Sequence, residues 1–130
     1  MKRRTDKILY RDLSDLIIKV AIEVQKELGA GFLEKVYENS MGIRFGERKV
    51  IYEKQKKIEV FYHGHIVGEF YANMIVNGEI IIELKAVEKL HPNHYAQLLN
   101  YLKASKYEVG YVINFGEKPL KFKRLVMLND

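Results

Sequence analysis

The sequence predicts a single α/β domain in which helices flank a mixed central β-sheet. First, helical and strand periodicities follow one another in the order α-α-β-β-β-α-β-β along the 130 residues, without an internal repeat. Second, the run from Ile80 to Val87 is hydrophobic at neighbouring positions, which is typical of a central strand covered on both faces. With 48% hydrophobic residues, the chain can bury one core.

The first residues differ from the rest of the chain. Residues 1–12 form a basic arm that contains Lys2, Arg3, Arg4 and Lys7 and has no apolar periodicity. We interpret this arm as a frayed terminus, with contact to a phosphate backbone as the alternative. Residues 13–130 are expected to form the single folded domain.

Two amphipathic helices are expected before the sheet. Apolar residues recur at spacings of three and four from Leu13 to Gly29, which predicts a helix capped near Asp12 or Ser14 and ended by the glycine. A second helix is expected from about Leu33 to Gly46. Its positions expected to face the core are Val36, Tyr37, Met41 and Phe45.

The hydrophobic period then changes to that of strands. Val50 to Tyr62 and His65 to Val76 are expected to form a hairpin around a turn at His63–Gly64. Asn77–Gly78 is a strong turn signal before a third strand from Glu79 to Val87. The remaining expected elements are a helix from about Asn93 to Ala104, after a loop at His91–Pro92, and strands from Val109 to Asn114 and from Phe122 to Leu128.

The turn at Asn77–Gly78 decides which polar side chains meet. Along the third strand, Glu83 and Lys85 share a face with Ile81, because side chains alternate. A two-residue turn would place Asn73 on the opposite face. A three-residue loop, Val76–Asn77–Gly78 with the glycine left-handed in a bulge, would pair Asn73 with Ile81 and bring Asn73, Glu83 and Lys85 onto one face. We favour the three-residue loop.

Two opposite charges inside an apolar run call for an explanation. Glutamate and lysine are almost never fully buried unless they are paired or functional. A solvated edge with a cross-strand ion pair is the alternative for Glu83 and Lys85. The three isoleucines that precede Glu83 favour a functional pair.

Two motifs give the chain a resemblance to a known family. Gly31 to Tyr37 fits the GxxExxY motif of a family of small prokaryotic proteins, and Gly68 to Asn73 followed by Glu83 to Ala86 is similar to the central hairpin of that family. The resemblance extends from about Leu13 to Val126. The family is placed in the PD-(D/E)xK nuclease superfamily, which implies a restriction-endonuclease-like fold and cleavage of nucleic acids with a divalent metal.

The resemblance also implies roles for individual residues. Glu34 resembles the helix acid of the site, Glu83 and the carbonyl of Leu84 resemble metal ligands, and Lys85 resembles the catalytic lysine. Hard oxygen ligands suit Mg²⁺ (or Mn²⁺), and a neighbouring lysine can orient or deprotonate the attacking water. Asn73 stands where the superfamily has a metal-binding aspartate.

Residues of the third predicted helix extend this site. Gln97 and Tyr101 lie four positions apart on one helical face and are similar to the Gln-x-x-x-Tyr element of RecB-like nucleases. That similarity implies a glutamine beside the metal and a tyrosine near the substrate. His94 and Tyr37 are further candidate contacts to nucleic acid. The alternative is an amphipathic helix with Tyr101 at the edge of the core.

Asn73 is expected to weaken the site. Asparagine keeps one oxygen but loses the negative charge, so the candidate carboxylates fall from three to two and metal affinity should fall. The chain is then either an inactive form, natural or engineered, or one that retains a slower metal-dependent activity on Glu34 and Glu83.

The leading hypothesis is therefore a Mg²⁺-dependent phosphodiesterase of nucleic acid, weakened or inactivated by Asn73. The alternative is a catalytically inactive nucleic-acid-binding or protein-interaction module on the same fold. A net charge of +5 suits a phosphate-rich partner, for which DNA is favoured over RNA, and a homodimer is one expected assembly. The absence of cysteine suits a reducing cytoplasm, and no apolar run is long enough to span a membrane.

Overall fold

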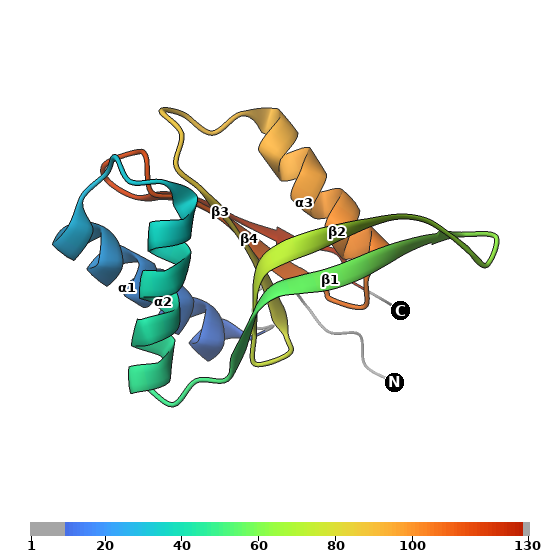
Figure 1. Ribbon diagram of the computed structural model, residues 1–130, viewed down its shortest axis with the longest axis horizontal. Coiled ribbons are helices and arrows are strands. Elements are labelled where there is room, and N and C mark those ends of the chain that lie inside the picture. Colours follow the sequence, from blue (N-terminus) through green and yellow to red (C-terminus); the bar gives the residue numbers. More distant parts are fainter. Residues whose placement is uncertain (1–9, 129–130) are drawn as a thin grey trace.

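A computed structural model describes residues 10–128, so most of the predicted basic arm lies outside the described residues. The order of helices and strands is the predicted one, which confirms the α/β class (Figure 1). The elements are α1 (Arg11–Leu28), α2 (Glu34–Glu47), β1 (Tyr52–Tyr62), β2 (His65–Val76), β3 (Ile80–Lys85), α3 (Pro92–Ala104), β4 (Val109–Asn114) and β5 (Lys121–Val126).

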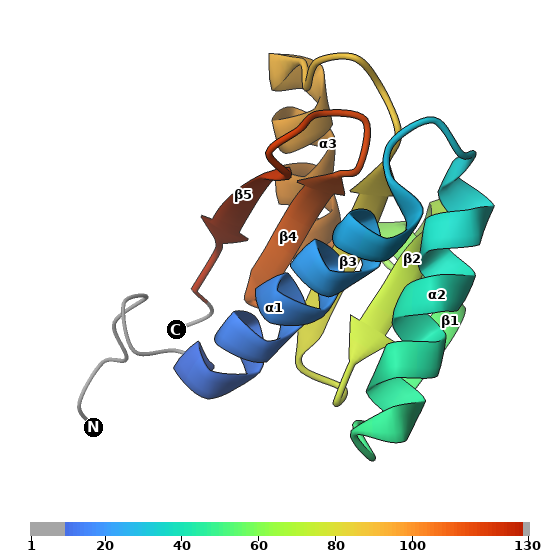
Figure 2. The ribbon, with the colours of Figure 1, turned by 90° about the vertical axis from the view of Figure 1, so that its left-hand side faces the viewer.

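The strands form one mixed sheet in the order β1-β2-β3-β4-β5. β3 and β4 run parallel, and the other neighbours are antiparallel. The parallel pair requires a crossover, which α3 supplies on one face of the sheet, while α1 and α2 cover the other face (Figure 2). Within residues 10–128, none of the helices is both long and apolar enough to cross a bilayer.

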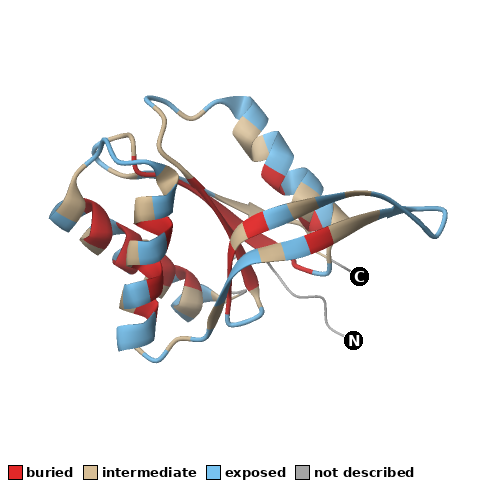
Figure 3. Ribbon diagram, viewed as in Figure 1, coloured by how far each residue is buried: buried red, intermediate tan, exposed pale blue. Residues whose placement is uncertain are grey.

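β3 is the central strand, and its two faces belong to different hydrophobic clusters. Ile80, Ile82 and Leu84 contact the cluster of α1 and α2, whereas Ile81 belongs to the cluster that contains Leu98 of α3. These four apolar residues of β3 are fully buried, as the two-sided hydrophobic run predicted. Figure 3 shows this burial concentrated between the helix layers, whereas the far end of the β1–β2 hairpin is exposed.

The beginning of α1 differs from the prediction. The helix begins at Arg11, after Tyr10 with φ of 55°, so neither Asp12 nor Ser14 caps it. Tyr10 and Leu13 contact the hydrophobic core, which explains why the helix extends beyond the polar residues that resemble caps. Its end is as predicted, because Gly29 has φ of 76° and donates its N–H to the Gln25 carbonyl.

The β2–β3 loop has the favoured length of three residues, but it begins one residue later than predicted. Val76 pairs with Ile80, and Asn77 and Gly78 adopt left-handed φ values of 53° and 65°. Asparagine tolerates this conformation, so both residues fit inside the loop. The resulting register pairs Met74 with Ile82, which brings Asn73 next to Glu83 instead of Ile81.

Candidate functional site

The hairpin of β1 and β2 changes its alternation at Asn73. Ala72 belongs to the hydrophobic cluster of α3, whereas Met74 belongs to the cluster of α1 and α2. On a regular strand, residues two positions apart share a face of the sheet. Ala72 and Met74 do not, so the backbone changes direction at Asn73. On β1, the pairs on either side place Gln55 across from Asn73, and Gln55 has a left-handed φ of 52°. Strained backbone of this kind is concentrated at functional sites.

Because the backbone changes direction here, the side-chain Nδ2, the side-chain Oδ1 and the backbone N–H of Asn73 all make hydrogen bonds to α2 or β3. The side-chain Nδ2 donates to Oε1 of Glu38 at 3.1 Å, and Oδ1 accepts the N–H of Leu84 at 2.9 Å. The backbone N–H donates to Oε1 of Glu83 at 3.4 Å. Asn73 therefore joins α2 to β3, next to two of the residues that the sequence predicted for the site.

Glu38 is a site residue that the sequence analysis missed. Its side chain is 1% exposed and accepts hydrogen bonds from Gln55 at 2.7 Å and from Lys35 at 3.1 Å, besides the one from Asn73. Burial raises the pKa of Glu38, but these hydrogen bonds outweigh it, and the pKa lies below its ordinary value. Glu38 is therefore a buried carboxylate that the protein keeps ionised.

The sequence contains a signal for Glu38. It precedes Met41 by three positions and Phe45 by seven, so it lies on the apolar face that the helical period predicts. A charged residue at such a position is unusual unless it has a partner.

Glu83 has the most perturbed carboxyl group of the site. It is 8% exposed, and burial raises its pKa to about 7, although the Asn73 N–H and the charge of Lys85 act in the opposite direction. Glu34 and Glu38 add to the rise. The charges that act on Glu83 therefore come from both β3 and α2, and its pKa lies near neutral pH.

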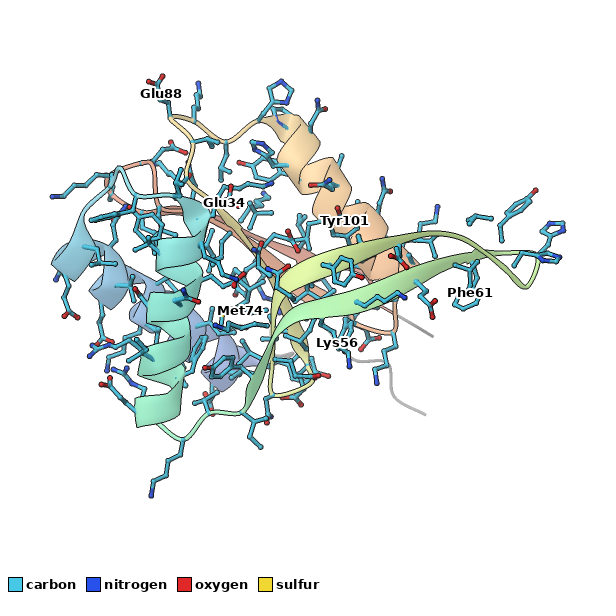
Figure 4. All side chains as sticks on the ribbon, in the orientation of Figure 1. Glu34, Lys56, Phe61, Met74, Glu88 and Tyr101 are labelled. Atoms are coloured by element: carbon cyan, nitrogen blue, oxygen red, sulfur yellow. The ribbon has the colours of Figure 1, made fainter. Side chains whose placement is uncertain are left out.

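Gln97 and Tyr101 of α3 lie over the same site. Their side chains are hydrogen-bonded, and the ring of Tyr101 stacks on Phe70 of β2 with 3.5 Å between ring centroids. Burial and the charge of Glu83 raise the pKa of Tyr101. Figure 4 shows Glu34 at the start of α2 and Tyr101 on α3, the two helices that flank the site.

His94 lies at the beginning of α3, where its ring has a structural contact. Its Nδ1 accepts the N–H of His91 at 3.0 Å, as part of a capping box. Burial lowers its pKa, and Lys85 and His91 lower it further, whereas Glu34 acts in the opposite direction. His94 is thus near Lys85 and Glu34, and it is partly exposed.

Tyr37 does not fit the predicted contact with nucleic acid. Its side chain is fully buried and stacks on Phe115, with ring centroids 4.4 Å apart. Its hydroxyl donates to the carbonyl of Gly29 at 2.7 Å and accepts the N–H of Phe32 at 3.2 Å. The hydroxyl therefore holds the loop that leads to Glu34, and we leave Tyr37 out of the candidate binding surface.

The donors at this site do not by themselves fit a divalent metal. Within residues 10–128, no three His, Asp or Glu side chains come together in an arrangement that could hold a metal ion. Glu38 is occupied by protein donors, and Asn73 is uncharged with its oxygen on the Leu84 N–H. Mg²⁺ prefers carboxylate oxygens in a near-octahedral arrangement, which these occupied side chains do not supply.

Comparisons with known proteins concern the family and the fold of the chain. A family model described as the PD-(D/E)XK nuclease superfamily matches residues 11–125. No curated protein matches the chain. Among solved structures, the crystal structure of SSO0001 is similar, with a TM-score of 0.57 and 16% sequence identity over 93% of this chain. The chain spans 61% of that protein, and at this identity the likeness concerns the fold alone.

Proposed function

The chain belongs to the PD-(D/E)XK nuclease superfamily, and from this premise we propose that it binds nucleic acid at the site of Asn73, Glu83 and Lys85. We further propose that its Mg²⁺- or Mn²⁺-dependent cleavage of phosphodiester bonds is weakened or absent because residue 73 is an asparagine. The GxxExxY subfamily assignment belongs to the same proposal.

The contacts of Asn73 carry this proposal. The residue lies against Glu83 and the Leu84 backbone, where the family resemblance implies a metal-binding aspartate. Its oxygen is neutral and already accepts a hydrogen bond. Without a carboxylate at position 73, Glu83 is the carboxyl group next to Lys85. Its pKa of about 7 makes Glu83 partly protonated at neutral pH. The site therefore has less negative charge than one with an aspartate at position 73, which lowers its expected affinity for a divalent metal.

The remaining side chains suit a phosphate-containing ligand. Lys85 supplies a partly exposed cation beside Glu83, and a cation there offsets the charge of a phosphate group. Gln97 and Tyr101 supply polar atoms from α3 near the same place. We expect DNA in preference to RNA, and a homodimer as one assembly in the cytoplasm.

The alternative function is a binding module without turnover. The hydrogen bonds of Glu38 favour this alternative. Its carboxylate accepts from Lys35, Gln55 and Asn73, so it is held by side chains of the protein itself. The two functions share nucleic-acid binding and differ in product formation.

Binding and cleavage can be tested together with labelled single- and double-stranded DNA and RNA. We expect affinity that falls with salt, and Lys85→Ala should weaken binding by about fivefold and reduce the salt slope by about one. Lys19→Ala is the matched control, because it removes the same charge from α1 on the other face of the sheet. With Mg²⁺ or Mn²⁺, little or no product is expected from the unmodified chain.

Two results would contradict the proposal. Equal loss of affinity in the Lys85 and Lys19 variants would mean that binding is not at this site. Rapid metal-dependent cleavage by the unmodified chain would mean that Asn73 does not weaken the activity.

A further inference from the structure

We propose that two copies of this chain associate through the outer edge of β1, by antiparallel pairing of residues 56–60 about a two-fold axis at Ile58. The inference deepens the proposed homodimer by assigning its interface. It rests on the proposed function only for the expectation of a dimer, and it does not depend on nucleic-acid binding or on cleavage.

β1 is an open edge of the sheet. It pairs with β2 on one side, and within residues 10–128 no strand lies on its other side. An open edge offers a row of backbone N–H and C=O groups that can pair with a further strand. Residues 56–60 are its regular part, because the left-handed Gln55 precedes them and the register shifts between Val60 and Phe61. Ile58 is the middle residue of this regular part.

Ile58 fixes this segment to the core. Its side chain is 8% exposed and belongs to the cluster that contains Leu98 and Leu102 of α3. Lys57 and Glu59 point to the opposite face of the strand, because side chains alternate. Since the backbone of this segment is already held in place, little conformational entropy is lost when a second strand pairs with it.

The face of the hairpin opposite α3 has two acids directly across from each other. Glu59 pairs with Glu69 in the register of β1 and β2, and like charges in such a pair are destabilising. The Nζ of Lys57 lies 3.1 Å from Glu69. A hydrogen bond to Glu69 raises the pKa of Lys57, and the charges of Glu69 and Glu59 raise it further. Lys57 thus serves two carboxylates, and a further cation next to Glu59 would be stabilising.

A second copy of the chain would supply that cation. In antiparallel pairing centred on Ile58, Lys57 of each copy stands directly opposite Glu59 of the other copy. The two-fold axis therefore creates two cross-strand ion pairs. Lys56 and Val60 stand opposite each other in the same way, so the aliphatic stem of the lysine can pack on the valine. Residues 56–60 are therefore complementary to themselves in this register.

The same arrangement gives the apolar outer part of the hairpin a partner. Large hydrophobic side chains are more than half exposed there, namely Phe61, Tyr62, Ile66, Val67 and Tyr71. Apolar patches of this kind mark interaction surfaces. Figure 1 shows the end of the hairpin projecting beyond the helices, so a second copy can reach it. Because the paired strands run in opposite directions, the hairpin end of each copy would lie along the beginning of β1 in the other copy.

Sedimentation velocity of the full chain, without nucleic acid or metal, tests this interface. We expect a monomer–dimer equilibrium with a Kd in the micromolar range, because edge pairing buries a small area. Glu59→Lys should weaken the dimer by about tenfold or more, since lysines then face each other across the axis. Its Tm should not fall, because the new lysine stands opposite Glu69 within the hairpin.

An exchange of the two charges should restore the dimer. Lys57→Glu alone should weaken association as Glu59→Lys does, whereas the double variant Lys57→Glu/Glu59→Lys should return to within about threefold of the original Kd. The exchange leaves the composition and the net charge of the chain unchanged. Glu88→Lys, an exposed change outside the hairpin, makes the same charge change as Glu59→Lys and is the matched control.

The inference is wrong if the unmodified chain stays monomeric at about 0.5 mM, a concentration far above a micromolar Kd. Dimerisation of Glu59→Lys with the affinity of the unmodified chain would also overturn it. So would a double variant that dimerises no better than the single variants. Because Lys85 is intact and no nucleic acid is present, these outcomes are separate from a failure of nucleic-acid binding.

Discussion

At the scale of single residues, Glu83 shows how the sheet controls the chemistry of a carboxyl group. Burial in the central strand raises its pKa to about 7. The folded state therefore binds more protons than the unfolded state from the ordinary carboxyl range up to that value. In this window the free energy of unfolding falls as the pH rises. Glu83 thus costs stability at neutral and alkaline pH.

Glu83→Gln should remove this cost. The new amide oxygen can still accept the Asn73 N–H, so we expect the variant to be more stable at pH 8 by about 2–3 kcal/mol, with little difference in acid. Urea unfolding across this pH range measures the effect, with the exposed Glu88→Gln as control. Parallel stability curves for the variant and the unmodified chain would contradict the account of Glu83.

The sequence predicted part of this residue-level picture. Strand alternation and an odd loop length were enough to expect Asn73 near Glu83, because both depend on local geometry. Glu38 and Gln55 could not be connected to the site in this way. Their contacts depend on how α2 and β1 approach the same point of β2, which no local pattern specifies.

At the scale of elements, the loop between α1 and α2 positions the beginning of α2. Tyr37 holds this loop through one donated and one accepted hydrogen bond, while its ring stacks on Phe115. Glu34 follows the loop directly, so its place near Glu83 depends on this contact.

Tyr37→Phe should loosen the loop and leave the core intact. We expect a loss of about 1 kcal/mol in the free energy of unfolding and faster hydrogen exchange at the Phe32 amide. Tyr71→Phe, at a half-exposed position, is the control. Unchanged exchange at Phe32 would show that the Tyr37 hydroxyl does not hold the loop.

Element order was predictable, and some element boundaries were not. The hydrophobic period of a segment indicates which of its side chains face the core. The order of helices and strands along the chain can therefore be predicted from these periods. The start of α1 depends on Tyr10 and Leu13 reaching that core, a tertiary effect. The β2–β3 loop shifted by one residue because Asn77 also adopts the left-handed conformation.

At the scale of the whole molecule, the site lies where the two halves of the fold meet. β3 carries Glu83 and Lys85 between the helix layers, and the crossover through α3 brings Gln97 and Tyr101 back over the same strand. α2 contributes Glu34 and Glu38 from its side of the sheet. The family match over residues 11–125 covers all three contributions.

Cleavage of labelled DNA with Mn²⁺ by the variant Asn73→Asp tests the central claim most directly. We expect Asn73→Asp to cut at least tenfold faster than the unmodified chain, and the additional change Lys85→Ala to abolish cutting. Equal cleavage by Asn73→Asp and the unmodified chain would contradict the claim. So would an Asn73→Asp variant that binds Mn²⁺ and DNA but forms no product.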